Sequence, residues 1–189
     1  MRIPFFVCQS VSFMAESDNL VWTCSICHEE PMRDAPLVYC ENCGIAVHQQ
    51  CYGYPLLKSI PEEDWFCDYC TANASSGCVL CPQSGGVLKR TTDARWVHLL
   101  CAMWLPEAFF RVPEGSDAID VLHIPESRFN ETCFICKEPR GACMTCSDSE
   151  CNAAFHVTCA LKRGIKFKYE TCRSGADIVF ATCNRHRKR

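Results

Sequence analysis

The spacing of cysteine and histidine residues constrains this chain more than any other feature. In its middle, Cys78 and Cys81 are separated by two residues, and His98 and Cys101 follow sixteen residues later with the same separation. Two thiolates on a tight turn, with an imidazole and a thiolate on one helix face, supply the four ligands of a tetrahedral zinc site. The intervening residues are enough for a short hairpin, with Gly85-Gly86 expected at its turn, and for the start of the helix. This segment is predicted to be a zinc knuckle.

Nineteen of the 189 residues are cysteines, so bound metal or disulfides must carry the fold. Small secreted domains often rely on disulfides. Two features oppose disulfides here: the number of cysteines is odd, and His48, His98 and His156 each stand three residues before a cysteine. Zinc sites use such histidines as ligands, whereas a disulfide framework does not require them. We therefore expect zinc and a reducing compartment.

A first array of ligands spans residues 24–70 and predicts two zinc sites. Its members are Cys24, Cys27, Cys40, Cys43, His48, Cys51, Cys67 and Cys70. Pairing of sequence neighbours would give two separate beads. Cross-bracing would instead place Cys24, Cys27, His48 and Cys51 on one zinc and Cys40, Cys43, Cys67 and Cys70 on the other. Interleaved loops fold the segment as one unit, with Trp65 as an apolar plug and residues 37–39 as a short strand.

A second array spans residues 133–186 and holds more cysteines than two sites need. One site is predicted from Cys133, Cys136, His156 and Cys159. In the other, Cys183 and His186 form a pair by spacing, and we choose Cys146 and Cys151 to complete it. Four residues separate Cys151 from His156, as four separate Cys43 from His48 in the first array. By spacing alone, Cys143 could replace Cys146. The residues then left away from the metals are Cys8, Cys143, Cys172, His28 and His123.

The segments around these arrays complete the expected organisation. Residues 1–23 begin with Arg2 and apolar residues, but Pro4 and polar residues interrupt the run, which is too short to span a bilayer. We expect a disordered extension there, and Met14 is an alternative start. Residues 105–132 are too apolar for a flexible tether, and Pro106 should end the helix before them. The expected order is an extension (1–23), a finger (24–70), a linker (71–77), a knuckle (78–104), a packed linker (105–132), a second finger (133–186) and a basic tail (187–189).

The residues of the first array resemble a PHD finger. The shared features are four cysteines, a histidine and three cysteines in order, four residues between Cys43 and His48, and Trp65 before Cys67. A RING-type ubiquitin-ligase domain is the alternative, but its variant with this ligand order has other spacings around the histidine. The phrase Ala46-Val-His-Gln-Gln-Cys-Tyr-Gly53 is also similar to the PHD family.

The resemblance extends over most of the chain, from Cys24 to His186. Its most specific phrases are Ile124-Pro125, Gly141-Ala-Cys-Met-Thr-Cys146 and Ala154-Phe-His-Val-Thr-Cys-Ala160. Together with the knuckle, they resemble the PHD finger–zinc knuckle–extended PHD finger cassette of histone-binding scaffold proteins. These include scaffolds of MYST-type acetyltransferase complexes and cofactors of the histone H3 lysine-79 methyltransferase. The expected fold class is therefore a set of small zinc-stabilised modules with irregular α+β structure: a cross-braced PHD finger, a zinc knuckle and an extended PHD finger.

The predicted zinc sites argue against catalysis. Each of the five sites has four protein ligands, which leaves no open position for water or substrate. We therefore expect a non-enzymatic protein with five structural zinc ions. The resemblance implies a nuclear chromatin reader that targets a histone-modifying complex. A ubiquitin-ligase-type adaptor and a structural protein–protein spacer remain the alternatives.

Charge is unevenly distributed and suggests two kinds of partner. Residues 24–70 hold eight acidic residues against Arg33 and Lys58, whereas residues 133–189 hold eleven basic residues against five acidic ones. The acidic finger suits the basic tail of histone H3, and the basic finger suits nucleosomal DNA without regard to sequence. The expected histone-binding residues are Glu29, Glu30, Asp34, Leu37, Val38, Tyr39, Glu41, Pro61, Glu62 and Glu63. The expected DNA-binding residues are Lys162, Arg163, Lys166, Lys168, Arg185, Arg187 and Lys188.

The histone prediction combines the residues with the PHD resemblance. A peptide would add as an antiparallel strand to residues 37–39. In the resembling fingers, the loop before the tryptophan receives the histone amino terminus, but the corresponding loop here is longer and lacks the usual glycine. The resemblance places Glu41 opposite the second residue of the tail, an arginine. Trp22, Met32 and Tyr39 give at most a partial aromatic cage, so we expect lysine four of the tail to be read unmodified. The alternative, which the resemblance to the methyltransferase cofactors implies, is a segment nearer lysine twenty-seven bound across the finger and the knuckle.

Overall fold

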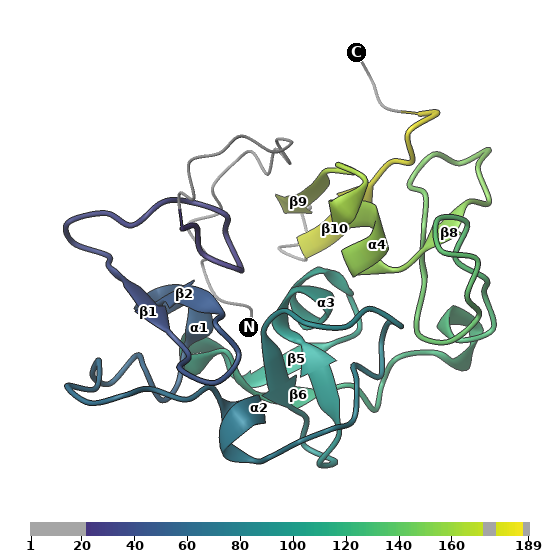
Figure 1. Ribbon diagram of the computed structural model, residues 1–189. Helices are drawn as coiled ribbons and strands as arrows, with labels where there is room; N and C mark the ends of the chain where they lie inside the picture. Colours follow the sequence, from purple (N-terminus) through teal and green to yellow (C-terminus); the bar gives the residue numbers. More distant parts are fainter. Residues whose placement is uncertain (1–21, 172–176, 187–189) are drawn as a thin grey trace.

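The computed structural model describes residues 22–171 and 177–186 (Figure 1). Apart from Trp22 and Thr23, the predicted N-terminal extension lies outside these residues. So do Cys8, Cys172 and the basic tail with Arg187 and Lys188. None of the helices in the described part of the chain has both the length and the apolar character needed to cross a membrane.

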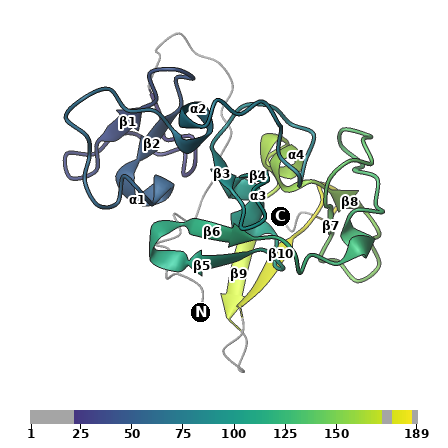
Figure 2. The ribbon, with the colours of Figure 1, turned by 90° about the horizontal axis from the view of Figure 1, so that it is seen from below.

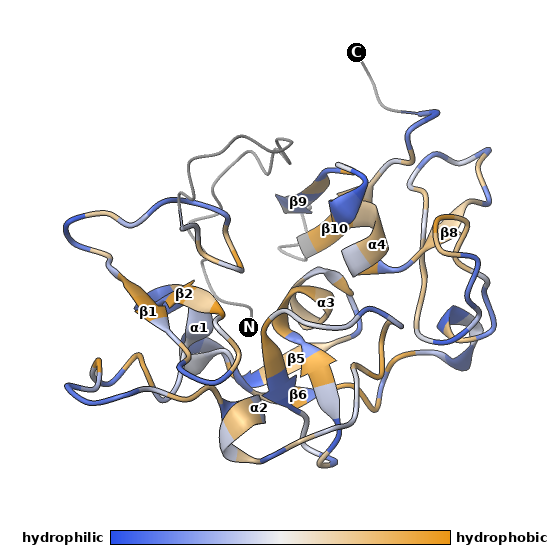
Figure 3. Ribbon diagram, viewed as in Figure 1, coloured by the Kyte–Doolittle hydropathy of each residue, from blue (hydrophilic) through white to orange (hydrophobic). Residues whose placement is uncertain are grey.

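Regular structure in the described residues consists of short helices and five two-stranded antiparallel sheets. Such small elements bury little surface on their own, and the cysteines form part of every local core. Figure 3 shows hydrophobic residues concentrated on α3, β1 and β5, whereas many of the connecting loops are hydrophilic. This architecture confirms the predicted class of small zinc-stabilised modules with irregular α+β structure.

The first finger is built on one hairpin. Strand β1 (Leu37–Tyr39) pairs with β2 (Ala46–His48), with Val38 opposite Val47. Helix α1 (Gln49–Tyr52) follows β2 directly, and α2 (Asp68–Thr71) begins directly after Cys67. The predicted strand at residues 37–39 is confirmed. Trp65 is buried against the Tyr52 ring at a centroid distance of 4.9 Å, which confirms its role as an apolar plug.

The knuckle also contains a hairpin, but its turn differs from the prediction. Strand β3 (Leu88–Arg90) pairs with β4 (Trp96–His98), and the chain reverses between them over residues 91–95. Gly85 and Gly86 precede β3, so the expectation that they form the hairpin turn is wrong. The Thr91 hydroxyl donates to Asp93 Oδ1 (2.5 Å) and thereby stabilises the observed turn.

The helix of the knuckle begins one residue later than expected. Helix α3 (Leu99–Trp104) has His98 at its N-cap with an extended backbone, so His98 ends β4. The expectation that His98 and Cys101 share a helix face is therefore wrong. The helix ends before Pro106 as predicted, since proline disfavours a helical residue before it.

Residues after α3 form a second hairpin that packs on the first. Strand β5 (Phe109–Val112) pairs with β6 (Asp117–Asp120) across the 3-10 turn η1 (Pro113–Gly115). Ile119 is fully buried, and its carbonyl accepts a hydrogen bond from Thr92 N at 2.9 Å. The turn η2 (Glu126–Arg128) then leads to the second finger.

The second finger contains two hairpins and one helix. Strand β7 (Met144–Thr145) pairs with β8 (Ala154–Phe155), and α4 (Val157–Lys162) follows. Strand β9 (Phe167–Thr171) pairs with β10 (Asp177–Ala181). Figures 1 and 2 both show α3 and its hairpins between the β1–β2 and β7–β8 hairpins, so the knuckle lies between the two fingers.

Candidate zinc centres and binding surfaces

Five groups of four ligands converge in the described residues. Within each group, the candidate ligand atoms lie within 4.8 Å of one another. The groups are Cys24, Cys27, His48, Cys51; Cys40, Cys43, Cys67, Cys70; Cys78, Cys81, His98, Cys101; Cys133, Cys136, His156, Cys159; and Cys146, Cys151, Cys183, His186. The first finger is cross-braced, and Cys146 rather than Cys143 joins the last group.

The separations fit tetrahedral zinc. With zinc–sulfur bonds of about 2.3 Å, two sulfurs on one tetrahedral zinc lie about 3.8 Å apart. The Sγ atoms of Cys43 and Cys67 are 3.8 Å apart, and those of Cys81 and Cys101 are 3.7 Å apart. The donor sets of three thiols with one imidazole, or of four thiols, are those of structural zinc sites. The residues present therefore fit zinc.

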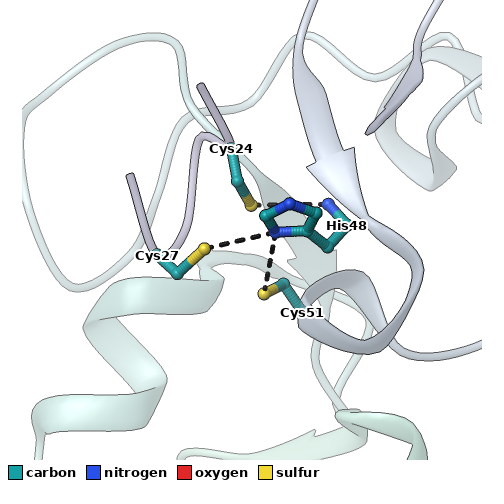
Figure 4. A group of neighbouring side chains, drawn as sticks. All are labelled: Cys24, Cys27, His48 and Cys51. Atoms are coloured by element: carbon teal, nitrogen blue, oxygen red, sulfur yellow. Dashed lines mark hydrogen bonds between the residues drawn. The ribbon is translucent and has the colours of Figure 1, made fainter. Parts of the chain in front are cut away.

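The first centre shows how a histidine ligand is oriented (Figure 4). Nδ1 of His48 lies 3.3 Å from Cys27 Sγ and 3.8 Å from Cys51 Sγ. Its other nitrogen, Nε2, lies 3.3 Å from the Glu30 carbonyl. A hydrogen on Nε2 that is donated to this carbonyl leaves Nδ1 free to bind metal.

The knuckle repeats this arrangement more tightly. Nδ1 of His98 lies 3.1 Å from Cys81 Sγ, and Nε2 lies 2.6 Å from the Gly85 carbonyl. In the second finger, Nδ1 of His156 lies 3.4 Å from Cys136 Sγ. Its Nε2 is buried and has no hydrogen-bond partner among the described residues. Three centres thus use one ligand plan, and two of them fix the imidazole through a backbone carbonyl.

Backbone N–H groups stabilise the thiolate form of several ligands. Cys67 N donates to Cys40 Sγ at 3.3 Å, and His98 N donates to Cys78 Sγ at 3.2 Å. Burial raises the pKa of the Cys40 thiol, but backbone donors led by Cys67 outweigh burial and lower that pKa to about 7. Because the thiolate is the form that binds zinc, these bonds prepare the site for metal.

Comparison with known proteins identifies the modules. The family model described as "PHD-zinc-finger like domain" matches residues 76–186, and the "PHD-finger" model matches residues 34–71. The chain belongs to the PHD-zinc-finger like family. The expected PHD finger–zinc knuckle–extended PHD finger organisation and the expectation of five zinc ions are thereby confirmed.

A solved structure and two sequence relatives support this membership. The crystal structure of zebrafish PHF14-PZP is 31% identical, covers 88% of this chain and 89% of its own, and superposes with a TM-score of 0.69. Protein Jade-1 from Bos taurus is 43% identical over 81% of this chain, and a bromodomain-containing protein homolog from Drosophila melanogaster is 38% identical over 86%. The matched segments make up 30% and 12% of those two proteins, so the chain spans less than a third of either. None of these three names denotes an enzyme.

The predicted histone-binding residues belong to strand β1 and to loops of the first finger. Strand β1 pairs only with β2 among the described strands, which leaves its other edge available. Leu37 and Val38 are buried, and the bond from Cys40 N to Ile45 O sets a ladder that leaves the backbone groups of Leu37 and Tyr39 on this edge. Tyr39 is 38% exposed, and its ring lies 5.8 Å from the Trp22 ring at a right angle. The exposed members of the predicted set are Glu29, Glu30, Asp34, Tyr39, Glu41, Pro61, Glu62 and Glu63.

The described DNA-binding candidates are all at the surface of the second finger. They are Lys162, Arg163, Lys166, Lys168 and Arg185. Lys162 ends α4, and Lys168 lies on β9. Lys162 Nζ also donates to Gln83 Oε1 of the knuckle at 2.6 Å. Arg187 and Lys188 lie outside the described residues.

Contacts between the modules carried little signal in the sequence. Lys89 on β3 is 1% exposed, and its Nζ donates to Tyr54 O (2.5 Å) and Asp68 Oδ2 (2.8 Å) of the first finger. Ala142 N donates to Leu80 O at 3.0 Å, which joins the second finger to the knuckle. The only hint of the first contact was a lysine within the apolar run Val87-Leu-Lys89, and its partner could not be deduced from spacing.

Proposed function

We propose that this chain is a non-catalytic chromatin reader that targets a histone-modifying complex in the nucleus. The first PHD finger binds the unmodified amino-terminal tail of histone H3, and the extended PHD finger contacts nucleosomal DNA. The observation that carries the proposal is the available edge of β1, on a finger with exposed acidic residues that matches the PHD-finger model.

Peptide binding would follow from strand addition. Main-chain hydrogen bonds to residues 37–39 supply affinity, and neighbouring side chains supply specificity. Glu29, Glu30 and Asp34 are exposed and offer carboxylates to basic side chains. Trp22 and Tyr39 form two walls at a right angle, which is only part of the enclosure that favours a trimethylammonium group. Lysine four of the tail is therefore read without methylation.

The histone proposal is tested by calorimetry with H3-tail peptides. The unmodified peptide should bind more tightly than the peptide trimethylated at lysine four. Cys40 N donates to Ile45 O, so Val38 faces Val47 in the ladder and the N–H of Tyr39 points away from β2. Tyr39→Pro removes that N–H and should abolish binding, while zinc content reports whether the finger stays folded. Tighter binding of the trimethylated peptide would refute the specificity.

The DNA proposal rests on the exposed cations of α4 and β9. The described residues offer no element for reading bases, so binding should be independent of sequence. It should weaken with salt, and a plot of log K against log salt concentration should have a slope of about −0.9 per phosphate contacted. Reversing the charges of Lys162, Arg163, Lys166 and Lys168 should weaken duplex binding and reduce the slope. Unchanged binding and slope would assign the interaction to the basic tail instead.

The alternative function, a ubiquitin-ligase adaptor, would give different results in binding and activity assays. Such a protein would bind a ubiquitin-conjugating enzyme and support autoubiquitination, whereas a reader would not. An autoubiquitination assay beside the histone-peptide assay separates the two functions. Failure of both assays would favour a structural spacer.

A further inference from the structure

A pocket lies where the three modules meet. Its cavity volume is about 370 Å³, enough for one or two amino-acid side chains. Residues Thr23, Ser25 and His28 of the first finger form one wall, and residues 83–87 of the knuckle form another. Helix α4 of the second finger closes the pocket with Thr158, Leu161 and Lys162. The proposed edge-strand binding at β1 does not use this pocket.

The polar groups of the pocket favour a negative charge. None of its lining residues is an aspartate or a glutamate. Lys162 Nζ bonds only the neutral Gln83 amide, at 2.6 Å, and forms no ion pair with a described carboxylate. Thr158 is 8% exposed, and its Oγ1 is buried without a hydrogen-bond partner among the described residues. A cation and an unused hydroxyl are groups that bind an oxyanion.

The pocket is continuous with the proposed peptide surface. Thr23 in its wall directly follows Trp22, whose ring lies 5.8 Å from that of Tyr39 at the end of β1. An extended peptide advances about 3.3 Å per residue. A peptide that contacts the Trp22–Tyr39 corner can therefore place a side chain only a few residues away in the pocket.

We infer that this pocket binds a phosphate group carried on a serine or threonine of the same peptide that pairs with β1. The peptide part of the inference rests on the proposed function, whereas the phosphate part does not. A free phosphate ion shares the same chemistry. Phosphorylation at the matching residue would therefore strengthen binding of the tail, because it adds charge-assisted hydrogen bonds to Lys162 and its neighbours.

The test uses H3-tail peptides that each carry one phosphoserine or phosphothreonine, measured by calorimetry against the zinc-loaded chain. One of them should bind about 10-fold more tightly than the unmodified peptide. Lys162→Gln should remove that gain. Arg140→Gln, which removes an equal charge from an exposed position outside the pocket, should preserve it.

A second variant guards against misfolding at Lys162. Ser84 is exposed at the pocket, so Ser84→Asp adds a carboxylate there with little strain and should also abolish the gain. Zinc content and the affinity for the unmodified peptide should stay unchanged in both pocket variants. No gain for any phosphopeptide, or an equal loss with Arg140→Gln, would overturn the inference.

A separate arm distinguishes this inference from the proposed function. Inorganic phosphate is titrated while the backbone amide NMR signals of residues 84–86 are followed. If H3 peptides fail to bind but these signals shift in wild type and not in Lys162→Gln, the pocket binds phosphate and only the peptide assignment falls. If phosphate shifts none of them, the pocket inference fails. A selective loss of duplex DNA binding in Lys162→Gln, without loss of the phosphopeptide gain, would also overturn it.

Discussion

The ammonium group of Lys89 lies 2.8 Å from a carboxylate oxygen of Asp68, and this ion pair joins the knuckle to the first finger. The Lys89 side chain is 1% exposed, whereas that of Asp68 is 34% exposed. Nζ also lies 3.8 Å from the centre of the Tyr52 ring. Burial lowers the pKa of Lys89 below its ordinary value, and the Asp68 carboxylate works against that shift. The two partners of the pair are therefore not equivalent.

Removal of Asp68 should destabilise the chain more than removal of Lys89. Asp68→Ala leaves a buried charge without its counter-ion, which costs about 3 kcal/mol. Lys89→Met keeps the buried stem and leaves Asp68 partly in water, so we expect a loss of about 1–2 kcal/mol, mainly from the hydrogen bond to Tyr54 O. Urea unfolding in the presence of zinc measures both losses. Arg95→Ala, which breaks an exposed pair with Asp93 and keeps the turn bonds of Thr91, serves as the control and should cost less than about 1 kcal/mol.

The Asp68→Ala variant should also regain stability as the pH rises. In the folded state the pKa of Lys89 lies below its unfolded value, so the unfolded chain binds more protons between the two. Stability therefore increases with pH across that interval, and the increase should be steeper in Asp68→Ala than in wild type. Unfolding measured from pH 7 to pH 10 checks this. Parallel curves for the two proteins would contradict it.

Gly53 and Gly115 allow the close contact between the first finger and the β5–β6 hairpin. A Cβ on Gly53 would lie 2.0 Å from the Gly115 carbonyl oxygen, and both Gly53 and Gly44 have a positive φ. Gly44 has no atom within 4 Å of the added Cβ, so Gly44→Ala should show only the backbone cost of about 1 kcal/mol. Gly53→Ala should cost about 2 kcal/mol more, since the backbone must shift. Hydrogen exchange should locate the added opening at Tyr54 N, which bonds Gly115 O at 2.8 Å. Equal losses of stability in Gly53→Ala and Gly44→Ala would refute the close contact between Gly53 and Gly115.

Zinc removal should separate the modules in a defined way. Each structural zinc contributes on the order of 10 kcal/mol of apparent binding that is linked to folding. Native mass spectrometry should show five zinc ions in wild type and four in Cys101→Ser. Loss of the knuckle zinc should expose both inter-module contacts to proteolysis, whereas Cys136→Ser should expose only the second finger. Acidification should release zinc, because protons compete for the ligands.

Tyr169 should anchor β9 to the knuckle mainly through its ring. The ring stacks on Trp104 at a centroid distance of 4.7 Å, and its hydroxyl donates to the Met103 carbonyl. Tyr169→Phe should cost about 1 kcal/mol, and Tyr169→Ala about 3–5 kcal/mol. Thermal unfolding of the zinc-loaded variants tests this order. Equal losses would assign the contact to the hydroxyl alone.

The zinc centres could be predicted from sequence because ligand chemistry fixes spacing locally. The separation of two residues between paired ligands identifies pairs such as Cys24 and Cys27, and the choice of Cys146 and Cys151 followed from a repeated gap. The hairpin turn could not be predicted in the same way. Gly85-Gly86 is a common turn signal, but the Thr91 hydroxyl bonds to Asp93 and to the Arg95 carbonyl place the turn later. Local side-chain bonds outweighed the glycine preference.

The contacts between modules were beyond sequence analysis for a different reason. Lys89 and Asp68 are separated by twenty-one residues, and no periodicity relates them. Gly141 lies so close to Leu80 that an added Cβ would be 2.7 Å from the Leu80 carbonyl oxygen. The sequence around Gly141 indicates only a glycine in a loop. Such contacts depend on how folded modules dock. The histone and DNA residues assigned from sequence stay predictions.

The position of the knuckle has a consequence for residence time on a large ligand. Because it is bonded to both fingers, the two outer surfaces cannot drift apart as they would on a flexible tether. Once one finger has bound, the other meets its target at a high effective concentration, provided that the target presents both features at the matching distance. Two weak attachments would then keep the chain bound to its target far longer than either attachment alone. A target with the wrong spacing would offer only one attachment at a time, so the chain would discriminate by geometry as well as by chemistry.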